Sequence, residues 1–248
     1  MIAALVLLAL LGGWEALVRA GGVDELILPA PTQVLAALWE DRALLAPDLW
    51  TTTYEVVLGL LAATVVGALL GAAMHLSPGV RRALHPFVIG SQAVPVPVLA
   101  PLVILVLGFG LAPKVLLVAL VCFFPITINL YDGLRGADPD ARRLLRSLQA
   151  SRWQALRLVE APAALPAAFT GLKVAAAVAV IGAVFAEWAG AEAGLGRVLI
   201  TANGQLETAR AFAAVLLLFL LAIVLYGACA LLERRVVDWI PRNDPGGP

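Results

Sequence analysis

The sequence predicts an all-α integral membrane protein with six transmembrane helices, forming one domain over residues 1–248. Two observations carry this prediction. Hydrophobic residues fill 62% of the 248 positions and charged residues only 14%, whereas about 25% of the residues in a soluble domain are charged. The apolar residues also form long blocks, unlike the short amphipathic stripes that build a soluble core. Together with a mean hydropathy of +0.95, this pattern indicates a surface that is largely covered by lipid.

Six apolar runs account for the predicted helices. A hydrocarbon core about 30 Å thick requires about 20 apolar residues in a helix. The chain contains six runs near this length: 2–18, 53–74, 86–109, 113–131, 168–189 and 211–232. The first run lacks the basic start of a cleavable signal peptide, so we interpret it as a retained helix. Six crossings place both termini on the same side of the membrane.

Basic residues give the predicted orientation, because short cytoplasmic loops are enriched in Lys and Arg. The turn after the second run, the loop after the fourth run and the tail are all basic, whereas the first loop and residues 190–210 have no basic excess. We therefore predict that both termini are cytoplasmic (N-in and C-in). The basic residues concerned are Arg81, Arg82, Arg135, Arg142, Arg143, Arg146, Arg152, Arg157, Arg234, Arg235 and Arg242.

Several function classes are disfavoured by the composition. The formal net charge of zero gives no support for a nucleic-acid partner. Cys122 and Cys229 both lie in apolar runs, so we expect neither a disulfide framework nor a four-ligand metal site. Lys114 and Lys173 are the only lysines, and neither follows the sequence Gly-x-x-x-x-Gly-Lys-Ser/Thr that holds nucleotide phosphates. We therefore expect no enzyme activity and no cofactor or metal in this chain.

The third run contains features of a helix that lines a pathway. Gln92 is followed by Pro95, Pro97 and Pro101, and each proline frees a backbone carbonyl at membrane depth. Such backbone is tolerated only where protein or a water-filled cavity covers it. Two interpretations stay open: a kinked helix that lines a translocation path with Gln92 facing it, or a kink that serves packing alone.

Polar residues in two other runs complete the candidate path. In the fourth run Asn129 lies one helical turn after Pro125, and Glu187 ends the fifth run. A carboxylate at mid-membrane costs about 2.5–3.5 kcal/mol. Glu187 is therefore either an interfacial acid beside Trp188 or a polar group at the mouth of the path. The candidate path residues are Gln92, Pro95, Pro97, Phe124, Asn129 and Glu187.

The basic loop at residues 138–160 contains a predicted amphipathic helix. Asp138-Pro139-Asp140 is typical of a helix start, where acidic groups interact favourably with the positive end of the helix dipole. Three leucines then share one face and two arginines another; these are Leu144, Leu145, Leu148, Arg142 and Arg146. Such a helix could lie on anionic lipid or present a docking surface to a soluble partner.

The same loop resembles the cytoplasmic EAA signature of binding-protein-dependent ABC importer permeases, in which Glu-Ala-Ala is followed by a Gly and later by Ile-x-Leu-Pro. The matching stretch runs from Arg143 to Pro162. Arg143 stands where the Glu is expected, and Gln149 where the Gly is. The other departures are Leu145 for an Ala, Val159 for the Ile and Ala161 for the Leu. Because φ > 0 costs a non-Gly residue about 1–2 kcal/mol, Gln149 implies either a strained turn or a different one.

The rest of the chain resembles the nitrate/sulfonate/taurine and pyrimidine-precursor branch of that superfamily over nearly its whole length. The short motifs of the branch recur here in the same order: Trp14-Glu15, Leu28-Pro29-Ala30-Pro31-Thr32, Ser91-Gln92 with Val94-Pro95, Leu107-Gly108-Phe109-Gly110, Phe124-Pro125, Ala150-Ser151-Arg152-Trp153-Gln154, Leu165-Pro166 with Gly171-Leu172-Lys173, and Gly194-Leu195-Gly196.

The resemblance implies a type I importer (MetI-like) permease fold in the bacterial inner membrane. It also implies two permease subunits paired with two ATPases, which bind the ATP and Mg²⁺, and an external solute-binding protein. We expect the second permease to be another copy of this chain. In that family the EAA segment forms a coupling helix that sits in a groove of the ATPase. The corresponding candidate coupling residues here are Arg142, Arg143, Leu144, Leu145, Arg146, Leu148, Gln149, Ser151, Arg152 and Trp153.

The expected function is therefore ATP-driven import of a small solute delivered by an external binding protein. The branch handles small anions such as sulfonates, taurine and nitrate, and also pyrimidine or flavin-like vitamins and precursors. Because we expect no Arg or Lys at the depth of the path, we favour a neutral, flat heterocycle, with an anion as the alternative. A secondary transporter is a further alternative, for which Glu187 is the only candidate buried ionisable group.

Overall fold

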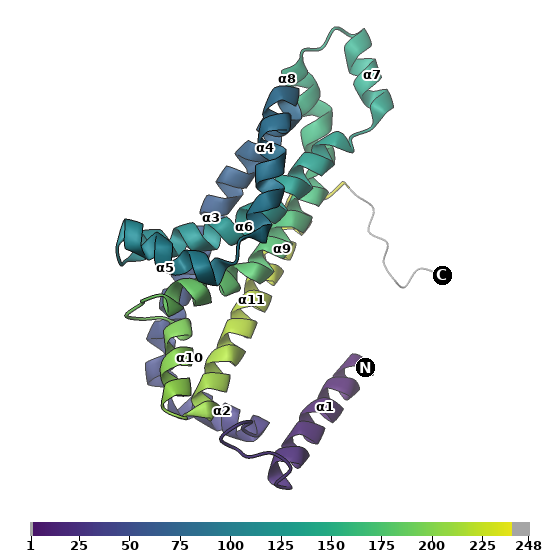
Figure 1. The fold of residues 1–248 in the computed structure, drawn as a ribbon. Helices are drawn as coiled ribbons and strands as arrows, with labels where there is room; N and C mark the ends of the chain where they lie inside the picture. The colour runs from purple at the N-terminus through teal and green to yellow at the C-terminus, as the bar shows by residue number, and fades with distance from the viewer. Residues whose placement is uncertain (1, 240–248) are drawn as a thin grey trace.

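The computed structural model describes residues 2–239, and these form an elongated set of helices without a β-strand (Figure 1). Arg242 of the predicted tail lies outside the described residues. The elements in chain order are α1 (Ile2–Arg19), α2 (Pro31–Glu40), α3 (Arg42–Leu76), α4 (Pro78–Gly90), a 3-10 turn (Ser91–Ala93), α5 (Val96–Leu107), α6 (Leu111–Arg135), α7 (Pro139–Ser147), α8 (Arg152–Ala155), a π-helical turn (Leu156–Glu160), α9 (Ala161–Trp188), α10 (Leu195–Gly204) and α11 (Thr208–Val236).

Within residues 2–239, four helices are long and apolar enough to cross a bilayer: α3, α6, α11 and the continuous stretch Arg152–Trp188, which joins α8, the π-helical turn and α9. They contain the second, fourth and sixth predicted runs and nearly all of the fifth. Each helix is longer than its run. At 1.5 Å per residue, the 35 residues of α3 span about 52 Å, against about 30 Å for the hydrocarbon core. Parts of these helices therefore extend beyond the membrane.

The third run, predicted as one kinked helix at 86–109, is broken into two helices. Pro78–Ala93 and Val96–Leu107 meet at an angle of 105°. Val94 and Pro95 between them are extended, because the residue before a proline is kept out of the α-helical region and proline has no N–H to continue the helix. The prediction of a single helix is therefore wrong. If this pair is one span, it is the fifth candidate span.

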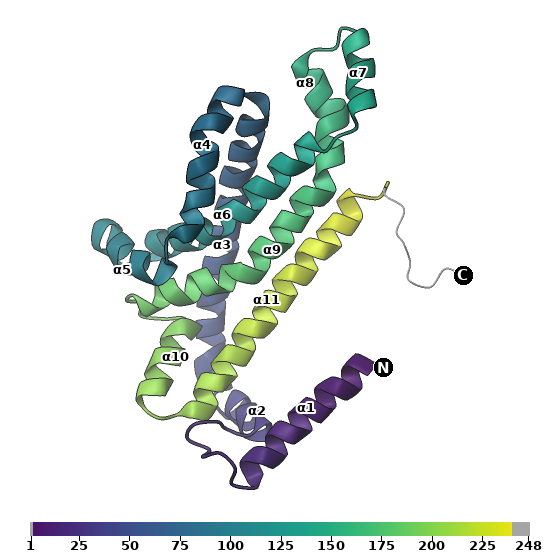
Figure 2. The same cartoon turned by 45° about the vertical axis from the view of Figure 1, so that its right-hand side comes forward.

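α1 contains the first predicted run and stands apart from the other helices along most of its length (Figure 2). Its contacts lie near its C-terminal end, where the hydroxyl of Thr32 donates to Glu15 Oε1 at 2.7 Å and the ring of Trp14 lies 6.2 Å from that of Phe212. Length and composition thus identify four or five spans. The sixth span, assigned to α1, and the N-in/C-in orientation stay predictions.

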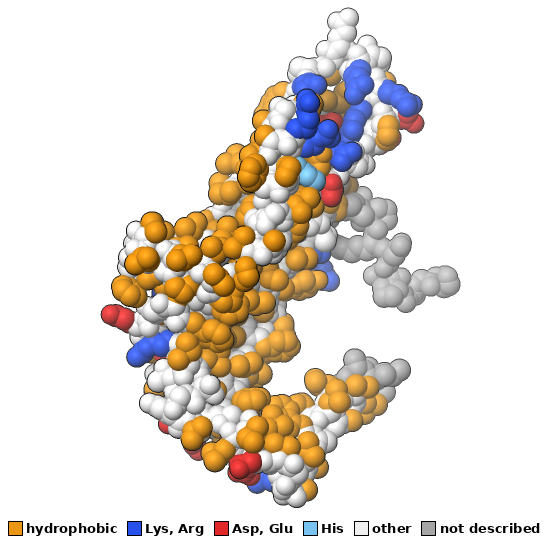
Figure 3. Space-filling model, in the orientation of Figure 1, with side chains coloured by type: hydrophobic (Ala, Val, Ile, Leu, Met, Phe, Trp, Pro, Cys, Tyr) orange, Lys and Arg blue, Asp and Glu red, His pale blue; other side chains and the backbone are white. Residues whose placement is uncertain are grey.

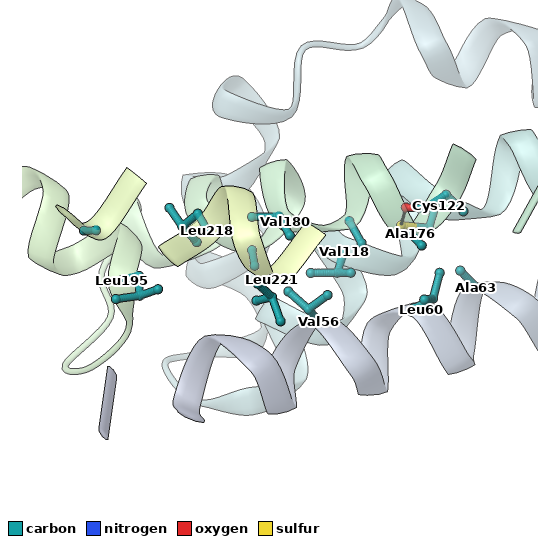
Figure 4. Packing of buried hydrophobic residues seen from close by; sticks show 14 of the residues in the cluster. Val56, Leu60, Ala63, Val118, Cys122, Ala176, Val180, Leu195, Leu218 and Leu221 are labelled. Carbon is teal, nitrogen blue, oxygen red and sulfur yellow. Dashed lines mark hydrogen bonds between the residues drawn. The ribbon is translucent and has the colours of Figure 1, made fainter. Parts of the chain in front are cut away.

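The core lies where α3, α6, α9 and α11 pack together (Figures 1 and 4). Its buried side chains include Val56, Leu60, Val118, Cys122, Ala176, Val180 and Leu218. Glycine allows the closest approach: a Cβ on Gly171 of α9 would lie 2.5 Å from the carbonyl oxygen of Pro125 on α6. Because lipid tails are as apolar as leucine, close packing of this kind is what holds helices together in a bilayer.

Candidate functional site

The candidate coupling segment, residues 138–160, lies at one end of the molecule, where basic side chains gather (Figure 3). Its predicted amphipathic helix is confirmed as α7, which begins where expected: Asp138 Oδ1 accepts a hydrogen bond from Asp140 N at 2.9 Å. Leu144 of α7 and Leu148, which caps its C-terminus, are 62% and 68% exposed, and Trp153 of α8 is 65% exposed. The described part of the chain therefore leaves an apolar surface uncovered at this end.

α7 ends in a left-handed turn at Gln149, where φ is 56°. Gln149 N donates to the carbonyl of Arg146 and Ala150 N to that of Leu145, both at 3.0 Å, which are the paired bonds of a Schellman motif. Glycine is favoured at this position because a Cβ is strained at positive φ. Of the two alternatives that the sequence left open, the structure shows the strained turn.

Two arginines of the coupling segment bind the ends of the long helices. Arg142 Nη2 donates to the carbonyls of Leu134 and Arg135, at 2.7 and 2.8 Å, in the last turn of α6. Arg152 Nη1 donates to the carbonyl of Leu76, the last residue of α3, at 3.0 Å. The last carbonyls of a helix lack partners within it and carry partial negative charge. Both arginines therefore tie the segment to helices that continue into the membrane.

Glu160 provides a second tie between the segment and α3. One carboxylate oxygen lies 2.7 Å from His75 Nε2, near the end of α3. The other lies 3.1 Å from Arg142 Nε, an ion-pair distance at which the N–H is not directed for a hydrogen bond. His75 and Glu160 are each 12% exposed. Sequence reasoning missed both residues, because 85 positions separate them and no local pattern joins them.

The remaining coupling candidates complete turns or face solvent. Ser151 Oγ accepts from Gln154 N at 3.3 Å while Gln154 Oε1 accepts from Ser151 N at 2.7 Å, so this pair caps the start of α8. Arg143 forms an exposed ion pair with Asp140 at 2.8 Å. Arg146 and the half-buried Leu145 line a cavity of about 490 Å³ between the segment and the end of α3.

The structure separates the candidate path residues into three places. Gln92, Pro95 and Pro97 are exposed at the break between α4 and α5. On α6, Phe124 packs against the cluster of Met74, Val88 and Tyr131, and Asn129 Nδ2 donates to the carbonyl of Pro125 at 2.8 Å. Glu187 lies in a third place, at the end of α9. Among the described residues no hydrogen bond joins Gln92, Asn129 and Glu187, so a path that includes all three stays a prediction.

Glu187 is 2% exposed and is bonded inside the subunit. Oε1 accepts from the hydroxyl of Thr52 at 2.7 Å, and Oε2 accepts from Gly196 N at 2.5 Å. The two preceding N–H groups are also capped: Leu195 N donates to Thr52 Oγ1 at 2.9 Å and Gly194 N to Asp48 Oδ1 at 2.7 Å. Oxygen acceptors from α3 and α9 thus satisfy the free N–H groups at the start of α10. The protein therefore buries Glu187, and both interpretations of this residue, an interfacial acid beside Trp188 and a polar group at the mouth of the path, stay predictions.

The motif Gly194-Leu195-Gly196 has a clear structural reason at this point. The φ of Gly194 is +123°, and a Cβ there would lie 2.3 Å from Glu187 Cδ. A Cβ on Gly196 would lie 2.8 Å from Glu187 Oε2. Only glycine lets the chain wrap this closely around the carboxylate.

A second buried carboxylate lies on α3, on the face of the helix that carries Asp48 and Thr52. Glu55 is 2% exposed; its Oε1 lies 2.5 Å from Lys114 Nζ on α6, and its Oε2 has no partner among the described residues. The expectation that Glu187 is the only buried ionisable group is therefore wrong. A signal was present in the sequence: Asp48, Thr52 and Glu55 are spaced by four and three residues, which places them on one face of a helix.

Comparisons with known proteins fit this architecture. The chain matches the model of the binding-protein-dependent transport system inner membrane component family over residues 56–238. It is 37% identical to the riboflavin transport system permease protein RibX of Chloroflexus aurantiacus, over 94% of this chain and 88% of the relative. The formylaminopyrimidine transport permease protein ThiX of Halalkalibacterium halodurans is 34% identical, over 91% and 90%. The taurine transport system permease protein TauC of Escherichia coli is 32% identical, over 94% and 87%.

The fold is also found among solved structures. A chain of the MetNI methionine ABC transporter superposes with a TM-score of 0.67 at 19% identity, over 79% of this chain and 97% of that one. This likeness confirms the predicted type I importer permease fold. The chain thus belongs to the binding-protein-dependent transport system inner membrane component family, as a permease subunit of an ABC importer and a multi-pass protein of the bacterial inner membrane.

Proposed function

We propose that two copies of this chain form the translocation path of an importer whose two ATPase subunits bind the ATP and Mg²⁺ and dock on the coupling segments. The observation that carries this proposal is the uncovered apolar surface of Leu144, Leu148 and Trp153. It lies on a segment that Arg142, Arg152 and Glu160 tie to the ends of α6 and α3. A surface that is open to a partner and tied to membrane helices is what coupling requires.

The hydrogen bonds of Arg142 and Arg152 suggest how movement of an ATPase is transmitted to the membrane helices. Because Arg152 binds the last carbonyl of α3 and Arg142 the last turn of α6, displacement of the segment pulls directly on two spanning helices. The break at Val94 and Pro95 lets α4 and α5 change their relative angle without unwinding a continuous helix. Alternating access then requires two arrangements that ATP and solute bind unequally.

α5 supports the assignment of a second copy. Leu105, Val106 and Phe109 at the end of this helix are 81%, 80% and 77% exposed, on an arm that points away from the core (Figure 1). Apolar side chains this exposed must be covered by lipid or by protein. We assign them to contact with the partner copy. This contact would surround the path, which the break between α4 and α5 near Gln92 would line.

The transported solute is proposed to be a neutral, flat heterocycle. Both lysines lie in the spanning helices, but each is paired: Lys114 with Glu55 at 2.5 Å and Lys173 with Glu233 at 2.7 Å. Neither offers a free cation to an anionic solute. The names of RibX and ThiX, which specify riboflavin and formylaminopyrimidine, favour the same class. TauC, named for taurine, supports the alternative of a sulfonate-type anion.

Reconstitution tests the proposal. The tagged chain, extracted in mild detergent, should co-purify its ATPase and, in proteoliposomes, import solute when ATP and binding protein are supplied. L144D/L148D should abolish co-purification of the ATPase, whereas R157Q, an exposed change outside this surface, should not. Uptake of labelled pyrimidine precursor, riboflavin and taurine would then separate the solute classes. Import without ATP, driven by an ion gradient, would identify a secondary transporter and contradict the proposal.

A further inference from the structure

A basic hollow of about 330 Å³ lies between α4 and α6, near the coupling end of the molecule. It takes no part in the ties described above. Its lining residues are Arg81, Arg82, His85, Pro86, Tyr131 and Arg135. Three guanidinium groups and an imidazole thus surround one small depression, which we call the arginine hollow.

Tyr131 organises the arginine hollow. The side chain is buried, at 3% exposure, and its hydroxyl accepts a hydrogen bond from Arg81 Nη1 at 3.3 Å. The guanidinium carbon of Arg135 lies 5.5 Å from the centroid of the same ring, within the range of a cation–π contact. The ring of His85 meets it edge-on at 6.1 Å. One buried ring therefore holds two cations from different helices at the rim of the hollow.

No carboxylate in the described part of the chain forms an ion pair with these cations. None of the residues that line the hollow is acidic, and within residues 2–239 no carboxylate lies within 4.0 Å of the guanidinium groups of Arg81, Arg82 or Arg135. Four basic residues elsewhere in the described chain differ from these three, because Arg142, Lys114, Lys173 and Arg210 each lie beside an acid. The hollow is complementary to an anion that the chain does not supply.

The position of the hollow indicates which anion this is. On α4 the basic residues are followed by Phe87 and Ile89, which are 77% and 51% exposed. On α6, Arg135 is the last residue of an apolar spanning helix. Both helices thus change from apolar to basic at this level, which is where a bilayer changes from acyl chains to headgroups.

We propose that the arginine hollow binds the phosphate of an anionic phospholipid, with the acyl chains lying over Phe87 and Ile89. A phosphodiester oxygen can accept from Arg81 and Arg135 together, and charge-assisted bonds of this kind are strong. Basic hollows between membrane helices are suited to headgroups of this charge. The site is independent of the coupling segment and of the proposed solute.

Native mass spectrometry of the purified chain tests the site, with phosphatidylglycerol and phosphatidylcholine of identical acyl chains. Phosphatidylglycerol should bind more tightly. R81Q/R135Q should lower its affinity about 25-fold, at about fivefold for each basic residue near a membrane surface, and leave phosphatidylcholine unaffected. R146Q/R157Q removes the same charge from exposed positions outside the hollow and is the matched control.

The proposal would be overturned by equal binding of the two lipids, by an equal loss in R146Q/R157Q, or by binding of soluble glycerol phosphate as tight as that of phosphatidylglycerol. Release of the lipid on assembly with the ATPase would assign the hollow to an acidic side chain of a partner and would also overturn it. If R81Q/R135Q does not fold, R82Q replaces it. Arg82 is exposed and, within the described residues, bonds only a carbonyl of its own helix, and its loss should cost about fivefold.

Discussion

At the coupling end, Arg142 and Arg152 donate to carbonyls at the C-terminal ends of α6 and α3. At the other end of the bundle, Asp48, Thr52 and Glu187 accept from the N–H groups that begin α10. Both regions use charged or polar side chains to satisfy helix ends, with cations at carbonyls and oxygen acceptors at N–H groups, as the helix dipole requires.

The two regions differ in burial. Glu187 and Glu55 are each 2% exposed, whereas the side chain of Arg142 is 23% exposed and Arg152 is exposed. A buried charge that loses its partner is costly, while a partly hydrated one can turn to water. The α10 end should therefore control whether the chain folds, and the coupling end whether a folded chain transmits movement.

Removal of Lys114 should have the largest effect. In K114A the carboxylate of Glu55 stays buried without its cation, which costs about 3–5 kcal/mol and lowers the midpoint of thermal unfolding in detergent. K173A is the matched control, because the side chains of Lys173 and Glu233 are 19% and 24% exposed and can rehydrate. The double variant K114M/E55Q should recover much of the loss. Equal effects of K114A and K173A would show that burial does not distinguish these pairs.

The next largest effect is expected for G194A. The new Cβ would lie 2.3 Å from Glu187 Cδ at a φ of +123°, and a clash of this kind together with the backbone strain costs about 3 kcal/mol. G204A, at the last residue of α10, is the control, since a Cβ there meets no atom within 4 Å. The measurement is the yield and unfolding midpoint of each purified variant. A G194A protein as stable as G204A would mean that α10 does not start against Glu187.

At the coupling end, E160Q should change transmission more than stability. Loss of its charge weakens the ties to His75 and Arg142, and a charge-assisted hydrogen bond is worth about 1.5–3 kcal/mol. We expect import per ATP hydrolysed to fall about tenfold, because the ATPase then moves a segment that is no longer fixed to α3. H75K, which places an ammonium group opposite Glu160, should retain coupling.

Hydrolysis and import, measured together in proteoliposomes, separate this effect from simple loss of protein. R143Q is the control, because the ion pair of Arg143 with Asp140 is 77% and 81% exposed and worth little. If E160Q lowered hydrolysis and import in the same proportion, Glu160 would be a structural residue and not a positioning one.

The sequence allowed the coupling end to be predicted in more detail than the α10 end. Helix α7 follows from local signals, namely the cap at Asp138 and a leucine face with helical spacing. The turn at Gln149 was recognised by comparison with a known signature. The ties of Glu160 to His75 and of Arg152 to Leu76 join positions 85 and 76 residues apart, and periodicity within one segment says nothing about such pairs.

At the α10 end the sequence does not indicate how deeply the carboxylate of Glu187 is buried. Hydropathy located the apolar run that Glu187 ends. Burial of its carboxylate, however, depends on Thr52 of α3, which lies 135 residues earlier in the chain. The same limitation affected the third run, where hydropathy indicated one continuous helix although the extended pair Val94 and Pro95 divides it. Composition measures how apolar a run is, and only tertiary contacts determine its direction and its neighbours.

The smallest expected effect is an increase in stability, in Q149G. Gln149 holds a φ of 56° in a turn that favours glycine, so glycine should stabilise the folded chain by about 1 kcal/mol and raise the unfolding midpoint by about 2–4 °C. S147G is the control, because glycine within α7 should instead destabilise it by about 1 kcal/mol. The opposite signs of the two changes in stability matter more for the test than their sizes. If Q149G does not raise the midpoint while S147G lowers it, the strain is absent from the isolated chain, and the left-handed turn forms only when the ATPase docks.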